Sequence, residues 1–177
     1  MNAQDAGRPS AAGAFGKDFP IMPRAHVEAR DPEALAKLAR GIGPGPFAAI
    51  VLFVSPEADR EALEASLPGA FPGVTVIGCT TAGEISPDGY AEGDIVAVGL
   101  PSALFAVECL GIDLSALDGQ ELIGRLIRAR AGLARKHGGW EDEFAFLMVD
   151  GLSIREDELT GALGPGLGPV PLFGGSA

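Results

Sequence analysis

The chain has 177 residues, 47% of them hydrophobic, and a mean hydropathy of +0.25, which excludes a globally disordered protein. Its 24 acidic against 13 basic residues give a formal net charge of −11, which repels a phosphate backbone and argues against a nucleic-acid partner. No apolar run reaches the roughly 20 residues of a membrane span, and the two cysteines form no CxxC pair. We therefore expect a cytoplasmic protein with reduced thiols and no membrane insertion.

The N-terminal stretch, residues 1–23, is rich in Ala, Gly, Pro and Ser and shows no sustained periodicity. This composition predicts a flexible tail. The stretch also lacks the basic start and apolar run of a secretory signal. From residue 24 onward apolar patterns alternate between two periods without an internal repeat, so we predict one domain over residues 24–177.

Strands and helices alternate in the first part of this domain. Strands are predicted at residues 25–29, 47–54 and 74–79, and the run FAAIVLFV at 47–54 is typical of a strand covered on both faces. Two dipeptides, Asp31-Pro32 and Ser55-Pro56, combine an N-cap residue with proline, so we expect a helix to begin at each. The cluster at 41–46 and Pro68-Gly69 are expected to end these helices.

A hairpin and further strand and helix segments follow. Asp94–Leu100 and Leu104–Leu110 are strand-like and are separated by three residues, too few for a parallel crossover, which predicts an antiparallel hairpin. Asp118 and Glu121 match a capping box that opens a long amphipathic helix reaching His137. The remaining elements are a strand at 144–149, a short helix capped by Ser153 and Glu156, a Gly/Pro linker at 164–168 and a last strand at 170–174.

This order of elements predicts the fold class: α/β, a layered sandwich with a mixed, mainly parallel sheet that includes one antiparallel hairpin. The long helix also carries a cluster of cations, and the helix dipole accounts for cations near a helix C-terminus. They are Arg125, Arg128, Arg130, Arg135 and Lys136.

Three predicted strand ends carry small and polar residues. In layered α/β sheets ligands bind beyond the carboxyl ends of the strands, where glycines allow close approach and amides and hydroxyls can hold an oxygen-rich group. The alternative is that the glycines serve turns and that Asp150 and Ser153 cap a helix. We predict a ligand site where the three ends meet at one sheet edge, formed by Gly78, Cys79, Thr80, Thr81, Gly83, Glu84, Asp150, Gly151, Gly174, Gly175 and Ser176.

The same three segments resemble one known family. IGCTTAGEI, the strand-end VDG before a capped helix, and the closing PLFGGSA are similar to the N-terminal domain of FIST proteins, bacterial intracellular sensory domains, over residues 26–177. The resemblance implies a sensor of a small ligand, with amino acids the proposed class, that signals to a histidine kinase, a diguanylate-cyclase-type enzyme or a chemotaxis receptor. Such proteins usually continue into a second, C-terminal FIST domain, so this domain is an expected partner if the chain is a fragment.

Haem binding and catalysis are the two alternatives. Some relatives are described as haem proteins that sense nitric oxide, and here a haem would be non-covalent because no CxxCH motif occurs. Its axial ligand would come from His26, His137, the cysteines, Tyr90 or a methionine, with His26 the better histidine. An enzyme would use Cys79 or the Glu84 and Asp150 carboxylates. Because no familiar catalytic motif occurs, we expect a sensor and not an enzyme.

Overall fold

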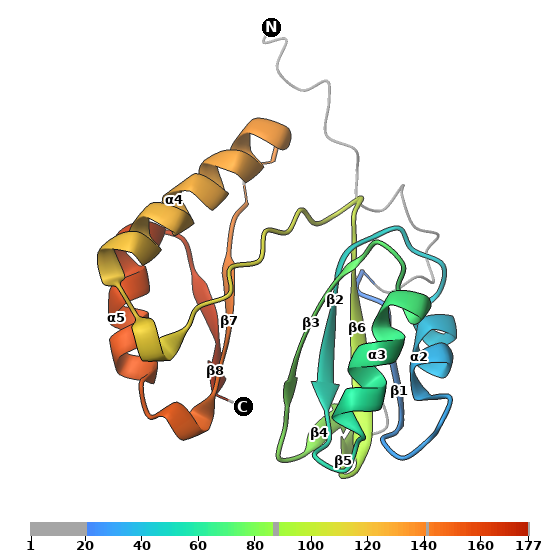
Figure 1. Ribbon diagram of the computed structural model, residues 1–177. Coiled ribbons are helices and arrows are strands. Elements are labelled where there is room, and N and C mark those ends of the chain that lie inside the picture. Colours follow the sequence, from blue (N-terminus) through green and yellow to red (C-terminus); the bar gives the residue numbers. More distant parts are fainter. Residues whose placement is uncertain (1–20, 87–88, 141, 177) are drawn as a thin grey trace, which may run out of the picture. The chain divides into compact units, whose positions relative to one another are not determined.

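The computed structural model describes residues 21–86, 89–140 and 142–176 (Figure 1). The chain divides into two compact units, an N-terminal unit up to Phe105 and a C-terminal unit from Ala106 onward. Most of the predicted tail lies outside the described residues. Among the described residues, no helix combines the length and the apolar character needed to cross a membrane.

A four-stranded mixed sheet forms the centre of the N-terminal unit. Its order is β1 (Arg24–Glu28), β6 (Asp94–Pro101), β2 (Phe47–Val54) and β3 (Thr75–Thr80). Strands β2 and β3 run parallel, whereas β6 is antiparallel to both β1 and β2. The mixed α/β class is therefore confirmed, with more antiparallel pairing than the sequence indicated because β6 inserts between β1 and β2.

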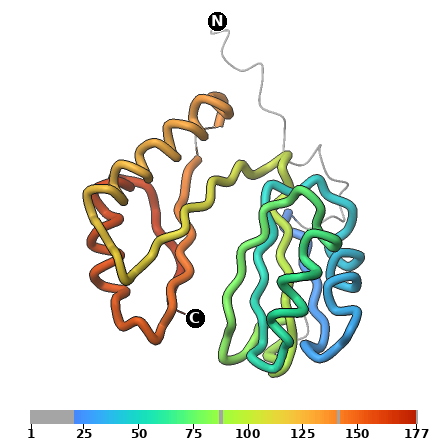
Figure 2. The backbone as a smooth tube through the Cα atoms, in the orientation of Figure 1, coloured from blue at the N-terminus to red at the C-terminus, as the bar shows by residue number. Residues whose placement is uncertain are grey.

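Two helices, α2 (Ala34–Ile42) and α3 (Arg60–Ala70), cover one face of this sheet (Figures 1 and 2). Leu35, Leu38 and Ile42 of α2 are buried against Ile50 and neighbouring sheet residues, and α3 contributes partly buried leucines to the same core. Because each helix packs on the sheet with one face, its leucines recur at helical spacing in the sequence.

The helix starts predicted at the two proline dipeptides are wrong. Helix α2 begins at Ala34, and α3 begins at Arg60 with Asp59 as its N-cap, the Asp59 carboxylate accepting from the Ala62 N–H at 3.1 Å. Ser55 and the residue after it form a turn instead, in which the Ser55 hydroxyl oxygen accepts the Glu57 N–H at 3.2 Å and the Ser55 carbonyl accepts an N–H three residues on. A serine turn and a helix N-cap use the same hydrogen-bond donors and acceptors, so the local sequence does not distinguish a turn at Ser55 from the start of a helix.

The predicted hairpin of residues 94–100 with 104–110 is also wrong. Residues 104–110 form no strand, and the chain turns at Pro101, whose carbonyl accepts the Leu104 N–H at 2.9 Å. The physical reason is that both edges of β6 are already occupied by β1 and β2. A short hairpin does occur elsewhere, between β4 (Glu84–Ser86) and β5 (Gly89–Ala91).

The C-terminal unit packs two helices on a parallel strand pair. Its elements are η1 (Leu114–Ala116), α4 (Gly119–Lys136), β7 (Ala145–Val149), η2 (Gly151–Ser153), α5 (Glu156–Leu167) and β8 (Leu172–Ser176). Strands β7 and β8 are parallel and form a sheet of their own within the described residues. The core is made of leucines from α4 and α5 together with Val149.

The cap of α4 confirms the sequence prediction. The Asp118 carboxylate accepts the N–H groups of Gln120 and Glu121 at 2.9 and 3.1 Å, and the helix ends at the C-cap His137. Helix α5 differs from expectation. Ser153 does not cap it, because the Ser153 hydroxyl donates to the Asp150 carbonyl at 2.6 Å. The predicted linker at 164–168 is mostly the last turn of α5, with Pro165 inside the helix.

One arginine of α4 has a role that the helix dipole does not describe. The Arg130 guanidinium donates to the last carbonyls of α5, those of Gly166 and Leu167, at 2.9 and 3.0 Å, and forms a two-pronged ion pair with Glu143 at 2.6 and 2.9 Å. Arg130 therefore caps a neighbouring helix. The ion pair lowers the pKa of Glu143 below its ordinary value.

Candidate functional site

The N-terminal unit has a shallow depression at the carboxyl ends of the parallel strands β2 and β3, where α/β sheets bind ligands. It has a volume of about 480 Å³ and is lined by Val54, Ser55, Pro56, Ala58, Asp59, Arg60, Glu61 and Thr80. The strand ends and the start of α3 therefore supply all of its walls.

Helix α3 begins at this depression, so the partial positive charge at the helix N-terminus lies on its rim. The first N–H groups of a helix have no intrahelical acceptor. Asp59 satisfies that of Ala62, which leaves the N–H groups of Arg60 and Glu61 available to a ligand. The helix dipole adds to their attraction for an anionic group. The Asp59 and Glu61 carboxylates on the same rim can in turn receive a cationic group.

The first sequence motif runs along β3 toward this depression. Gly78, Cys79 and Thr80 pair with Leu52, Phe53 and Val54 of β2, so the chain reaches the sheet edge only at Thr80. Of the predicted site residues, Thr80 is the one that lines the depression. The sequence did not predict that the start of α3 lines the site, although the strand FAAIVLFV ends at the same depression.

The next motif residues serve the structure. Glu84 is 2% exposed, and its carboxylate accepts the Thr81 hydroxyl at 2.5 Å and the Asp94 N–H at 3.2 Å. The Thr81 N–H donates to the Val54 carbonyl at 3.0 Å. Glu84 thus braces the end of β3 against the start of β6. The Asp94 carboxylate in turn lies 2.9 Å from His26 Nδ1.

Gly83 lies against the Tyr90 side chain. A Cβ placed on Gly83 would lie 2.2 Å from the Tyr90 hydroxyl, because the Tyr90 ring from β5 crosses the loop at this point. Any larger residue would displace the ring, which is 69% exposed. Because the exposed ring can move, this contact alone does not require glycine at position 83.

The two remaining motif segments come together in the C-terminal unit. Because β7 and β8 are parallel and Val149 pairs with Ser176, Asp150 and Ser176 lie at the same end of this strand pair. The Asp150 carboxylate accepts the Leu152 N–H at 2.9 Å, which shapes the η2 turn that starts at Gly151.

The glycines before Ser176 lie inside the strand pair, opposite Leu147 and Met148. Gly174 has a φ of 133°, and a Cβ there would lie 1.9 Å from the Leu147 carbonyl oxygen. Only a residue without a Cβ can adopt this backbone conformation so close to a carbonyl oxygen. Gly174 is thus needed by the sheet, while Gly175 has open space around it.

Most of the chain matches a known protein family. Residues 48–177, well over half of the chain, match the model of the FIST N domain. The chain belongs to the FIST family. No curated protein and no solved structure matches it significantly. FIST is a family of sensory domains, and the matched region contains both the depression beyond β3 and the Asp150 turn.

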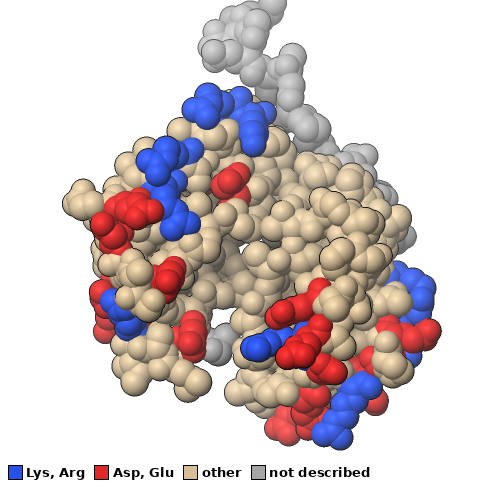
Figure 3. Space-filling model, in the orientation of Figure 1, with Lys and Arg blue, Asp and Glu red and all other residues tan. Residues whose placement is uncertain are grey.

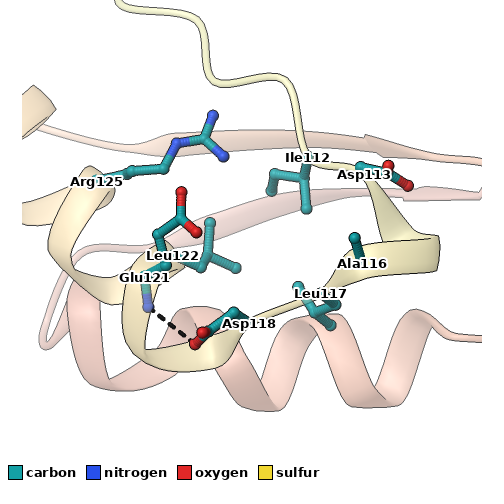
Figure 4. Close-up of a pocket in the computed structure, with 8 residues that line it drawn as sticks. All are labelled: Ile112, Asp113, Ala116, Leu117, Asp118, Glu121, Leu122 and Arg125. Carbon is teal, nitrogen blue, oxygen red and sulfur yellow. Dashed lines mark hydrogen bonds between the residues drawn. The ribbon is translucent and has the colours of Figure 1, made fainter.

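This FIST chain has a second, smaller hollow in its C-terminal unit, of about 170 Å³ (Figure 4). Apolar and polar side chains both line it, and three of the polar ones already have partners. Asp118 caps α4, the Asp113 carboxylate accepts from Ser115 at 2.8 Å, and the Arg125 guanidinium donates to the Gly111 carbonyl at 2.6 Å. The hollow is also not lined by the carboxyl ends of the parallel strands β2 and β3, where α/β sheets bind ligands.

The cysteines and histidines of this FIST chain have ordinary environments. Burial raises the pKa of the Cys79 thiol, and burial together with Glu108 raises the pKa of Cys109. Each therefore carries less nucleophilic thiolate than a free cysteine. His137 ends α4 and packs on Trp140 with a ring separation of 5.0 Å, and His26 lies against Asp94. Each histidine has a structural partner that explains its position without a haem.

Proposed function

We propose that this FIST protein is a cytoplasmic sensor that binds a small polar metabolite, an amino acid or a similar compound, and signals to a histidine kinase, a cyclase or a chemotaxis partner. The observation that supports the proposal most strongly is the depression at the carboxyl ends of β2 and β3, which Thr80 of the IGCTTAGEI motif lines. Its position is the one that parallel strands favour for ligands.

The rim of the depression suits a molecule that carries charges of both signs. The N–H groups at the start of α3 and the hydroxyl of the exposed Thr80 can hold a carboxylate. The Asp59 and Glu61 carboxylates lie on the same rim and can bind an ammonium group. Arg60 also lines the depression, but its guanidinium lies 3.7 Å from the Glu64 carboxylate. A purely anionic ligand would therefore lie close to two carboxylates with little basic compensation, so a zwitterion fits better.

Signalling follows from a shift between conformations. A ligand that contacts Thr80 and the start of α3 favours one arrangement of the loop after β3, and we expect a corresponding change in the loop after residue 150. A partner protein then reads this arrangement. In the N-terminal unit, Glu84 limits the change to residues 82 and 83, because it ties the end of the loop to β6 and also accepts the Thr81 hydroxyl.

The experiment is a thermal-shift screen of the full chain with the common amino acids, and with haem as a separate probe. A ligand at 100 times its Kd stabilises the folded state by about 2.7 kcal/mol and raises Tm accordingly. Thr80→Val should abolish the shift. Thr75→Val is the matched control, because Thr75 is an exposed threonine at the opposite end of the same strand.

Two results would contradict the proposal. The first is the absence of any shift with all of these probes. The second is an equal shift in Thr80→Val and Thr75→Val, which would place the binding site elsewhere. Chromatography of the incubated ligand completes the test, because a sensor returns its ligand unchanged whereas an enzyme using Cys79 or the carboxylates would consume it.

A further inference from the structure

The turn after β7 presents two large aliphatic side chains to solvent. Leu152 is 92% exposed and Ile154 is 88% exposed. The turn is ordered by its own hydrogen bonds, since Asp150 accepts the N–H of Leu152 through its carboxylate and the hydroxyl of Ser153 through its carbonyl. We refer to residues 151–154 as the knob.

Ile154 adds a second unusual feature to the knob. Its φ of 51° and ψ of 35° are left-handed, which is rare and costly for a β-branched residue. Asparagine or glycine would adopt this conformation with less strain. This strained backbone conformation places an isoleucine side chain in solvent, where it stabilises nothing in its own unit. Such a side chain is expected to contact another molecule.

The surroundings of the knob are acidic. Asp150 precedes it, and Glu156 and Asp157 follow in the first turn of α5. The nearby Arg155 is neutralised by a two-pronged ion pair with Glu158, at 2.7 and 2.8 Å. The knob is therefore an apolar tip with an acidic rim, which disfavours an anionic membrane and favours a partly apolar surface with basic side chains.

The outer face of α4 is such a surface. Figure 3 shows Lys and Arg side chains gathered over the C-terminal half of this helix. Ile127 is 52% exposed, and Arg128, Ala131, Arg135 and Lys136 are also exposed. Arg130 points the other way, into its contacts with α5 and Glu143. We refer to residues 127, 128, 131 and 135 as the basic face.

The knob and the basic face lie at opposite ends of the C-terminal unit. The C-terminal end of α4 leads into the start of β7, and the knob follows the end of β7 (Figures 1 and 2). The two surfaces therefore cannot meet within one copy of this unit. We propose that the knob of one copy docks on the basic face of another copy, so that the chain self-associates head to tail.

Such a contact is heterologous, because it joins two different surfaces of the same chain. It uses complementary charge in a protein whose net charge of −11 otherwise keeps copies apart. It also covers the two aliphatic side chains of the knob with Ile127 and the alkyl stems of the arginines. Each added copy leaves one knob and one basic face open, so association grows with concentration.

The test is the molar mass of the full chain by light scattering across a concentration series at low and high salt. The wild type should exceed the 18.0 kDa of one chain at high concentration and return toward it as salt screens the charges. Leu152→Ser/Ile154→Asn, the knob variant, should be monomeric. Arg128→Glu/Arg135→Glu, the face variant, should be monomeric too. Arg24→Glu/Arg40→Glu makes the same charge change at two exposed arginines of the N-terminal unit, away from the β2–β3 depression, and should still associate.

Mixing the two monomeric variants separates this contact from any symmetric one. The knob variant keeps an intact basic face and the face variant keeps an intact knob, so an equimolar mixture should form a complex of two chains and stop there. Circular dichroism of each variant establishes that it is folded. A wild type that is monomeric at every concentration would overturn the proposal, and so would a mixture of folded variants that stays monomeric.

Discussion

Removing the Glu84 carboxylate is the most direct test of how the first motif is used. In the structure Glu84 is 2% exposed and accepts from two donors, the Thr81 hydroxyl and the Asp94 N–H. Glu84→Ala leaves these donors without their acceptor, and Glu84→Gln keeps one oxygen and most of the volume. If the carboxylate is a brace, both variants lose stability before any ligand is added.

The size of the loss follows from the two hydrogen bonds. A hydrogen bond to a charged group contributes about 1.5–3 kcal/mol. The Thr81 hydroxyl can turn to the Val54 carbonyl 3.5 Å away, so only the Asp94 N–H is left wholly unpaired. We therefore expect Glu84→Ala to lower the free energy of unfolding by about 2–4 kcal/mol and Glu84→Gln by about 1 kcal/mol.

Urea denaturation of the full chain measures this loss. The fluorescence of Tyr90, the one tyrosine in the sequence, reports on the N-terminal unit in a Trp140→Phe background that removes the other strong fluorophore. Ile85→Ser is the matched control, because Ile85 is the neighbouring residue and is 82% exposed. A Glu84→Ala variant as stable as this control would refute the brace and return Glu84 to the list of ligand contacts.

Three further predictions concern other parts of the chain. Gly174→Ala should cost several kcal/mol and unfold the β7–β8 pair in hydrogen exchange, because its Cβ would overlap the Leu147 carbonyl, whereas Gly175→Ala should be tolerated. Arg130 lowers the pKa of Glu143, so the stabilisation from this pair is fully present above the ordinary pKa of 4.5 and is lost as the pH falls through the lower pKa of the folded state. Glu143→Gln should therefore reduce the decrease of unfolding free energy measured at acidic pH. Iodoacetamide should alkylate Cys79 more slowly than free cysteine at pH 8, since burial raises its pKa; faster reaction would favour the nucleophile alternative.

The sequence determined most of the individual elements. The apolar run of β2 and the Asp118 cap of α4 were predicted to the residue, because a buried strand and a capped helix are fixed by side chains within a few positions of one another. The family was also evident from three short motifs, and the family model confirms it. Thr80 lies at the end of β3, where a strand end was expected, and its contact with a ligand stays a prediction.

Tertiary structure decided which elements pair and what the polar residues do. Residues 104–110 have a strand-like pattern but form no strand, because both edges of β6 are taken by residues distant in sequence. Glu84 is a brace only because Asp94 and Thr81 meet it, and Arg130 caps α5 only because α4 packs beside that helix. A residue's local pattern favours a conformation, whereas the partner it pairs with depends on which strand edges and hydrogen-bond acceptors the fold leaves unoccupied.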